Sequence, residues 1–157
     1  MTVARLGRRS RDELKGVHPD IVGVVEESIM LMPQGYDFGV HDGIRTLAEQ
    51  REYLRRGVSR TMNSKHLPQA DGYGHAVDLV PYIMGRFRWE WEPIYVIAAV
   101  VRSVAESRNV RIRWGGFWDE LTGTTEDPKV LVRQYVDQCR KEGRKAFIDG
   151  PHYELIT

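Results

Sequence analysis

The chain has 157 residues, a formal net charge of +1 and one cysteine, Cys139. This length fits one domain with a substantial core, the balanced charge argues against a nucleic-acid surface, which usually shows a strong basic excess, and a single cysteine excludes an internal disulfide bond. No apolar run approaches the ~20 residues that a membrane helix needs, and the basic amino terminus lacks the apolar core of a signal peptide. We therefore expect one domain over residues 1–157, made in the cytoplasm, with Cys139 reduced.

The first part of the chain predicts a tail and a helix. Residues 1–9 are rich in arginine and are expected to form a loosely ordered basic tail. Ser10 and Glu13 have the spacing of a capping box, and His18-Pro19-Asp20 marks a second helix start, because proline is favoured in the first turn. The second helix should end near residues 33–35. Its core-facing positions recur at helical spacing and are Ile21, Val24, Val25, Ile29 and Met32.

The middle of the chain predicts two strands separated by a helix and a loop. Residues 36–41 favour a short strand, and Thr46-Leu47-Ala48-Glu49 is a further capping box that opens a helix reaching Gly57. The serine, asparagine, proline and glycine content of residues 61–73 is typical of a loop. Residues 74–81 then predict the second strand.

The second half of the chain predicts two more helices and two more strands. Pro93 opens the clearest helix, and Asp127 caps another that spans residues 128–143. Strands are predicted over residues 111–114 and 146–156. The sequence as a whole therefore indicates an α+β fold, with a small, mainly antiparallel sheet and helices packed against it.

Two short segments between these elements carry aromatic residues or glycines. Trp89 and Trp91 come just before the helix at Pro93, and the sequence leaves open whether they line a groove or pack against the helix start. Gly115-Gly116 follows a strand and lets the backbone pass close to another element or to a ligand.

Three side chains from separate segments could close on one divalent metal ion. A hydrolytic zinc site uses three protein ligands, usually histidine nitrogens and a carboxylate, and keeps one position open for water. His66, Asp78 and His152 would supply such a set. If residues 74–81 form a strand, His75 and Asp78 face opposite sides of the sheet, which favours His66 as the partner of Asp78. On a helix, His75 and Asp78 would instead be neighbours.

A zinc hydrolase also needs a proton acceptor that is not a metal ligand. Asp149 lies just before a Gly-Pro turn, and Glu154 lies two residues beyond His152 on the last predicted strand. Strand alternation places His152 and Glu154 on one face and Tyr153 on the other. The residues alone therefore leave Asp149 and Glu154 as rival bases.

Four motifs, in a fixed order, carry a resemblance to a known family. They are Ser64-x-His66, Gly74-x-Ala76-x-Asp78, Trp114-Gly115-Gly116-x-Trp118 and Asp149-x-x-His152. With these motifs the chain resembles the LAS metallopeptidases, also called the M15 or VanY-like group, and within it the phage L-alanyl-D-glutamate endopeptidases that lyse bacteria. The resemblance runs from Asp42 to Leu155. The connections at residues 67–73 and 119–147 are longer than in those relatives.

The resemblance implies a role for each matching residue. It implies one zinc ion bound by His66, Asp78 and His152, and it places the catalytic base at Asp149. Arg45, in Gly43-Ile44-Arg45-Thr46, matches the arginine that binds a substrate carboxylate or the developing oxyanion. The resemblance also implies substrate contacts from Ser64, Trp114 and Trp118.

The resemblance also implies a fold and an activity. The fold would be like that of the hedgehog domain and the DD-peptidases, and the activity would be cleavage of the L-Ala–D-Glu bond in the peptidoglycan stem peptide. A D-Ala-D-Ala carboxypeptidase with the same zinc site and a non-catalytic zinc-bearing binding module are the alternatives. An endolysin of this kind would be a monomer that binds no nucleic acid, does not insert into a membrane and reaches the cell wall through a membrane pore.

Overall fold

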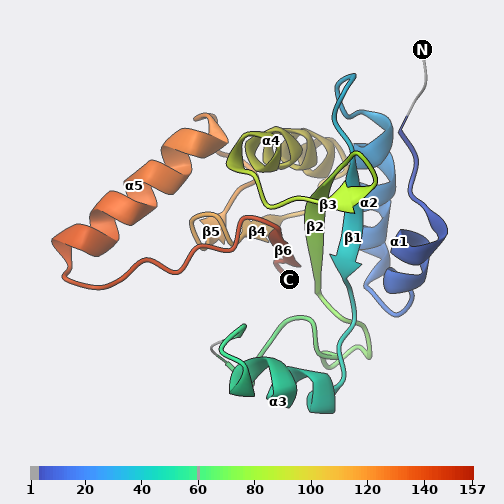
Figure 1. Ribbon diagram of the computed structural model, residues 1–157, viewed down its shortest axis with the longest axis horizontal. Coiled ribbons are helices and arrows are strands. Elements are labelled where there is room, and N and C mark those ends of the chain that lie inside the picture. Colours follow the sequence, from blue (N-terminus) through green and yellow to red (C-terminus); the bar gives the residue numbers. More distant parts are fainter. Residues whose placement is uncertain (1–3, 60) are drawn as a thin grey trace.

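The computed structural model describes residues 4–59 and 61–157 and has a central sheet with helices around it (Figure 1). The helices are α1 (Arg8–Glu13), α2 (Pro19–Met30), α3 (Leu47–Arg55), α4 (Trp91–Ser107) and α5 (Pro128–Lys141). The strands are β1 (Phe38–Asp42), β2 (Ala76–Ile83), β3 (Arg86–Phe87), β4 (Ile112–Trp114), β5 (Asp119–Glu120) and β6 (His152–Leu155). These elements confirm the predicted α+β class.

The sheet is antiparallel at every strand pair. The strand order is β1-β2-β6-β4-β5, and β3 pairs with β2 as a short hairpin beside this path. The last strand of the chain therefore lies between strands that come much earlier. In the pairing of β2 with β6, Asp78 lies opposite His152. Chain topology alone thus brings two of the three expected metal ligands together.

The alternation of side chains gives the sheet two different faces. On one face, Val77 and Leu79 of β2 and Tyr153 and Leu155 of β6 belong to the hydrophobic core, together with apolar residues of α2 and α4. Asp78 lies between Val77 and Leu79 and therefore points to the other face. We call this second face the site face.

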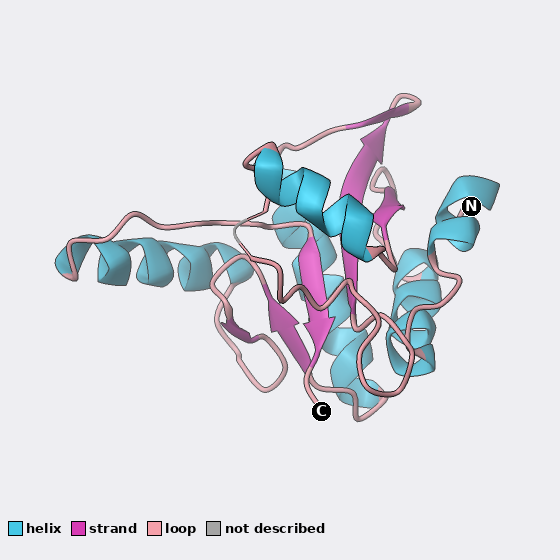
Figure 2. Cartoon of the chain, turned by 90° about the horizontal axis from the view of Figure 1, so that it is seen from below, coloured by secondary structure: helices cyan, strands magenta, loops and turns pink. Residues whose placement is uncertain are grey.

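Two helices lie away from the central layer. Figure 1 shows α3 beyond the ends of β1 and β2, and both Figure 1 and Figure 2 show α5 extending outwards from the body of the protein. The N-terminus of α5 is capped as the sequence predicts, because the Asp127 carboxylate accepts a hydrogen bond from the Lys129 N–H and Pro128 begins the helix. Among the described residues, no helix is long and apolar enough to cross a membrane.

The structure corrects several predicted boundaries. Ser10 does not cap a helix, because α1 begins two residues earlier and Ser10 is buried within it. The expected loose tail ended at residue 9, whereas Arg8 and Arg9 belong to α1 and Leu6 packs into the core. Residues 1–3 lie outside the described part of the chain.

Other elements differ from the predictions in length. The helix expected at Pro93 begins at Trp91, and the last strand covers His152–Leu155 where residues 146–156 were expected. The two-residue strands β3 and β5 were not predicted, because so short a segment shows no hydrophobic period. The helix starts at His18, Thr46 and Asp127 are confirmed, and at each of them the side chain accepts a hydrogen bond from the helix.

The buried Ser10 hydroxyl gives a test of this fold. It accepts a hydrogen bond of 2.9 Å from the Val40 N–H and joins α1 to β1. We expect Ser10→Ala to lower the free energy of unfolding by about 1–3 kcal/mol, because a buried N–H loses its acceptor. Urea denaturation followed by circular dichroism measures this. Ser103→Ala, at an exposed position of α4, is the control and should leave stability nearly unchanged. Equal stability of both variants would contradict the role of Ser10.

Candidate metal centre

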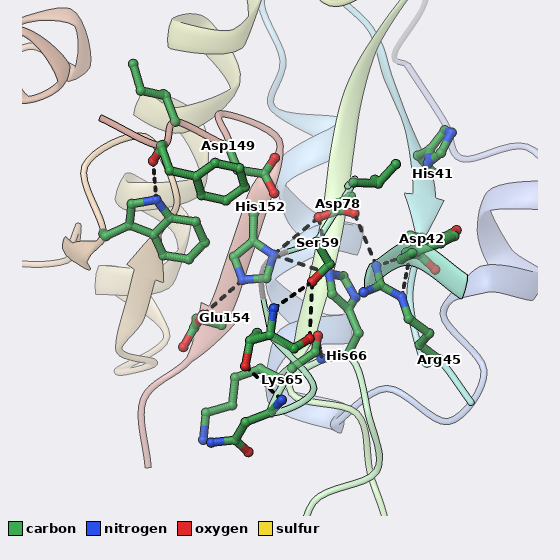
Figure 3. A pocket seen from close by; sticks show the side chains of 18 of the residues that line it. His41, Asp42, Arg45, Ser59, Lys65, His66, Asp78, Asp149, His152 and Glu154 are labelled. Atoms are coloured by element: carbon green, nitrogen blue, oxygen red, sulfur yellow. Dashed lines mark hydrogen bonds and ion pairs between the residues drawn. The ribbon is translucent and has the colours of Figure 1, made fainter. Parts of the chain in front are cut away.

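A cavity of about 720 Å³ opens on the site face and contains the expected metal ligands (Figure 3). Asp78 comes from β2, His152 from the first position of β6, and His66 from the loop between α3 and β2. The structure therefore brings together His66, Asp78 and His152, which are far apart in the sequence.

The three ligand atoms form a nearly equilateral triangle. His66 Nε2 is 3.2 Å from His152 Nδ1 and 3.3 Å from Asp78 Oδ1, and His152 Nδ1 is 3.4 Å from the same oxygen. Tetrahedral zinc with ligand bonds of about 2.0–2.1 Å places its ligand atoms about 3.3–3.4 Å apart. The spacing of the triangle therefore fits one zinc ion bound by these three atoms.

The outward nitrogens of both imidazoles are held by fixed acceptors. His66 Nδ1 lies 2.8 Å from the Gly43 carbonyl oxygen, and His152 Nε2 lies 2.9 Å from Glu154 Oε1. Each acceptor favours a proton on the outward nitrogen and leaves the lone pair of the inward nitrogen for a metal. Glu154 therefore lies behind His152, on the far side of the ring from Asp78.

The electrostatics of the triangle favour a bound cation. Asp78 Oδ1 is buried and lacks a hydrogen-bond partner among the described residues, and burying a carboxylate without compensation is costly. Burial opposes ionisation of Asp78, but the neighbouring His66 and His152 overcome this effect and hold its pKa well below the usual range. A divalent cation bound by two neutral imidazoles would supply the missing positive charge. The donor set thus fits zinc chemically as well as geometrically.

Without a metal, a proton on the His152 ring would supply the positive charge. Burial alone lowers the pKa of His152, but its contacts with Asp78 and Glu154 and the nearby charge of Asp149 raise that pKa to about 10. The carboxylates around the ring therefore attract positive charge strongly. Metal and proton compete for the same imidazole, so metal binding should weaken in acid.

Asp149 is held at the edge of the cavity by a close approach of two backbone segments. The Asp149 N–H donates to the Gly115 carbonyl oxygen and the Gly115 N–H donates to the His152 carbonyl oxygen, both at 2.9 Å. A Cβ at residue 115 would lie 2.4 Å from the Asp149 carbonyl oxygen, so only glycine fits there. This confirms the predicted close backbone passage and fixes Asp149 relative to His152.

The environment of Asp149 makes it a weaker acid than a free aspartic acid. Burial is the main cause and the charge of Asp78 adds to it, so that the pKa of Asp149 is raised to about 6. Asp149 lines the cavity, and Figure 3 shows its carboxylate near His152 and Asp78. A carboxyl group with such a pKa can both accept and release a proton near neutral pH.

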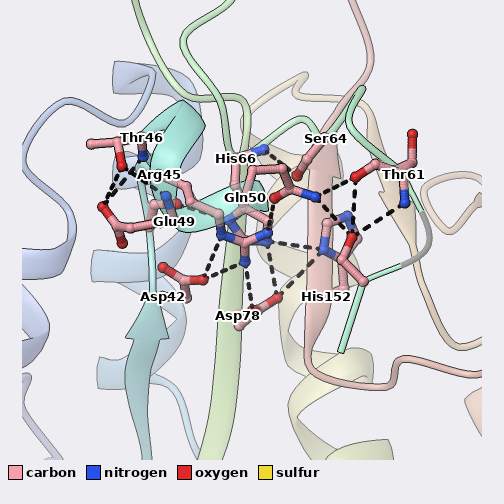
Figure 4. A network of polar contacts seen from close by, with 12 residues as sticks. Asp42, Arg45, Thr46, Glu49, Gln50, Thr61, Ser64, His66, Asp78 and His152 are labelled. Atoms are coloured by element: carbon pink, nitrogen blue, oxygen red, sulfur yellow. Dashed lines mark hydrogen bonds and ion pairs between the residues drawn. The ribbon is translucent and has the colours of Figure 1, made fainter. Parts of the chain in front are cut away.

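Arg45 closes the opposite side of the centre (Figure 4). It is 6% exposed, and its guanidinium group donates to Asp42 through Nε and Nη2 and to Gln50 through Nη1. Its Nη2 also lies 4.0 Å from Asp78 Oδ2. The Gln50 amide in turn donates to the Ser59 hydroxyl and the Thr61 carbonyl oxygen. This network ties α3 and the following loop to the metal centre.

The comparisons with known proteins agree on one family. The family model described as phage L-alanyl-D-glutamate peptidase matches residues 2–156. The chain belongs to this family. It is 26% identical over 156 residues to an L-alanyl-D-glutamate peptidase of Escherichia phage T5, with 97% of this chain and 98% of that protein covered. It also resembles the crystal structure of the L-Ala D-Glu endopeptidase ChiX of Serratia marcescens, with a TM-score of 0.69 and 33% identity over 97% of this chain and 90% of that one.

The structure corrects one expected contact of this family member. Trp114 does not line the cavity, because it is fully buried, stacks on Tyr153 and donates from its indole N–H to the Gly150 carbonyl oxygen. Trp118 and Ser64 do line the cavity. The Trp118 ring packs against His152 at 5.2 Å between centroids, and the Ser64 hydroxyl accepts from the His66 N–H.

Sequence reasoning missed several other residues that line the cavity. Asp42 and Tyr53 line it beside Arg45, whose guanidinium lies 4.3 Å from the centre of the Tyr53 ring. Gln50 is fully buried and accepts from Arg45 without lining the cavity. The sequence did offer one signal for these residues. They lie close to Arg45 along the chain, at the end of a predicted strand or in the helix that follows it. Trp89, which the sequence left open, is 57% exposed and lines the cavity.

The triangle predicts metal binding by this family member that can be measured directly. We expect one zinc ion per chain by elemental analysis, and an increase in the free energy of unfolding of about 2.7 kcal/mol when free zinc is 100 times its Kd. Asp78→Asn should lose both effects. The matched control is Asp71→Asn, which alters a carboxylate in the nearby loop that contacts His75 instead. Retention of stoichiometric zinc by Asp78→Asn would contradict the assigned site.

Proposed function

We propose that this protein is a zinc metallopeptidase of the M15, or VanY-like, group that cleaves the L-Ala–D-Glu bond in the stem peptide of bacterial peptidoglycan. The observation that carries the proposal is the triangle of His66, Asp78 and His152, whose spacing fits one zinc ion. The names of the family and of both relatives support this choice of bond. The protein would act as a monomeric endolysin after release through a membrane pore.

The metal and the protein would divide the chemistry between them. Zinc, when bound by His66, Asp78 and His152, would supply the Lewis acidity that polarises a carbonyl group and lowers the pKa of a water molecule. The cavity around it supplies positioning and proton transfer. The remaining residues of the cavity therefore determine which bond is cut and how the proton moves.

Asp149 is the proposed general base. It would take a proton from the attacking water through a carboxylate oxygen and pass that proton to the nitrogen of the leaving amine. Its raised pKa and its place in the cavity wall support this role. Glu154 is the weaker candidate, because its carboxylate already accepts from His152 Nε2 and lies behind that ring. Its proposed role is to orient His152.

Arg45 is the proposed binding site for a carboxylate of the substrate. Three of its five N–H groups donate to Asp42 and Gln50, so two remain for a ligand in the cavity that it lines. The stem peptide carries a free carboxylate beside the scissile bond, on D-glutamate. Charge-assisted hydrogen bonds to Arg45 would fix this group and hence the register of the peptide. Ser64 and Trp118 would complete the contacts.

The products of cleavage test the proposed bond. We expect the zinc-loaded protein to release a peptide with D-glutamate at its amino terminus from purified peptidoglycan, as identified by mass spectrometry, and a chelator to stop this release. A D-Ala-D-Ala carboxypeptidase would instead release free D-alanine. Release of D-alanine alone would overturn the proposed bond, and the absence of any hydrolysis would favour a binding module.

The pKa of Asp149 predicts how activity depends on pH. A general base must be ionised, so kcat/KM should fall as the pH drops below about 6, the raised pKa of Asp149, and a bound cation should shift this limb to lower pH. Asp149→Asn should lower kcat by about 10²- to 10⁴-fold. Glu154→Gln is the control and should keep the acidic limb. Loss of that limb in Glu154→Gln, with activity retained in Asp149→Asn, would assign the base to Glu154.

A further inference from the structure

The site face continues beyond the metal centre along β2. Alternation places Asp78, Val80 and Tyr82 on the same side of this strand, and Val80 pairs with Gly39 of β1. The register shift between Val40 and Asp42 changes the alternation of β1 at this point. A second group of side chains therefore lies on the sheet surface next to the metal centre.

Four aromatic rings form a continuous row on this surface. The ring centres of Trp89 and His41 are 5.5 Å apart, those of His41 and Phe87 are 5.3 Å apart, and those of Phe87 and Tyr82 are 5.5 Å apart. We call Trp89, His41, Phe87 and Tyr82 the aromatic row. Its two ends are open to solvent, because Trp89 is 57% exposed and Tyr82 is 41% exposed. Contiguous exposed aromatic surface of this kind marks binding sites.

The aromatic row connects the catalytic cavity with a second one. Trp89 and His41 line the cavity of the metal centre, whereas Phe87 and Tyr82 line a separate cavity of about 400 Å³. Gly39 makes room for the row, because a Cβ at that residue would lie 2.7 Å from Phe87 Cε1. The two cavities and the rings between them therefore form one extended surface.

The second cavity is rich in positive charge. Arg5, Arg8 and Arg9 line it, and the Arg9 guanidinium lies 5.6 Å from the centre of the Phe87 ring. Within residues 4–59 and 61–157, none of these three arginines forms an ion pair. The one carboxyl group in the lining is Asp37, and burial raises its pKa. The cavity therefore offers hydrogen-bond donors to oxygen-rich or acidic groups.

We propose that the aromatic row and the basic cavity bind the polysaccharide strand of peptidoglycan. This inference rests on the proposed function, because the stem peptide in the catalytic cavity is attached to that strand next to the scissile bond. Sugar rings expose C–H faces that pack on aromatic rings, and their hydroxyl, acetamido and carboxyl oxygens accept hydrogen bonds from arginine. A polymer leaving the catalytic cavity along the row meets these groups in succession.

The position of the row favours a sugar chain over a second peptide. A peptide that extends a sheet pairs with the main chain of an edge strand. The edge of the sheet at β1 is already engaged by α1, where the Val40 N–H donates to Ser10. The aromatic row lies on the face of the sheet and offers ring surfaces without a row of free backbone groups. Its chemistry therefore matches a saccharide.

A comparison of two substrates tests the proposal. The first is the free stem tetrapeptide, and the second is the same peptide on a glycan strand of several disaccharides. The zinc-loaded parent should show a lower KM for the second. Tyr82→Ala and Arg9→Gln, which alter residues outside the catalytic cavity, should each raise that KM by about 3- to 10-fold and leave cleavage of the free peptide unchanged. Tyr73→Ala, which removes a 40% exposed aromatic residue outside the row, is the matched control.

A binding measurement separates this proposal from the proposed function. Peptide-free glycan strands are titrated into the metal-free protein and followed by isothermal calorimetry. The parent and Tyr73→Ala should bind, and Tyr82→Ala and Arg9→Gln should bind about 3- to 10-fold more weakly. Equal binding by all four proteins, or no binding by the parent, would overturn the proposed saccharide site even if the free peptide is cleaved. If the parent binds glycan more tightly than Tyr82→Ala and Arg9→Gln but cleaves no peptide, the proposed saccharide site is supported and the proposed function is overturned.

Discussion

The buried Asp78 oxygen between two imidazoles is the interaction on which the rest of the site depends. Burial of this carboxylate is costly unless positive charge lies beside it, since Oδ1 has no hydrogen-bond partner among the described residues. The fold supplies two imidazole rings at metal-binding distance and fixes the outward nitrogen of each, that of His66 through a carbonyl group and that of His152 through Glu154. The protein therefore presents a preformed set of donor atoms that fits a cation.

The antiparallel sheet makes this arrangement rigid. Asp78 and His152 lie opposite each other on paired strands, so their separation is set by main-chain hydrogen bonds and does not depend on flexible loops. Of the three residues, only His66 comes from a loop. That loop is held in place because the backbone N–H of Arg45 donates to the His66 carbonyl oxygen. The same face of the same strand then carries Tyr82, so that catalysis and the proposed saccharide contact share one framework.

The sequence was sufficient for the class of the fold and for the three residues that the structure brings together as a candidate metal site, and insufficient for the shape of the cavity. Their proximity could be predicted because histidine and carboxylate residues stood in ordered motifs, and strand alternation correctly separated His75 from Asp78. Trp114 could not be placed, because an aromatic residue beside a glycine pair can face either the core or a cleft, and only the stacking on Tyr153 decides. The aromatic row was likewise invisible, because its members come from four separate positions that meet only through the β1–β2–β3 pairing.

The outward nitrogens of His66 and His152 have acceptors that differ in how a substitution would alter them. The acceptor behind His66 is the main-chain carbonyl of Gly43, and glycine is required there because a Cβ would lie 1.9 Å from the Glu13 carbonyl oxygen. The acceptor behind His152 is the side chain of Glu154, which a single nucleotide change can remove. In related proteins, we therefore expect the affinity of this site for a cation to vary through substitutions of Glu154, while Gly43 stays unchanged.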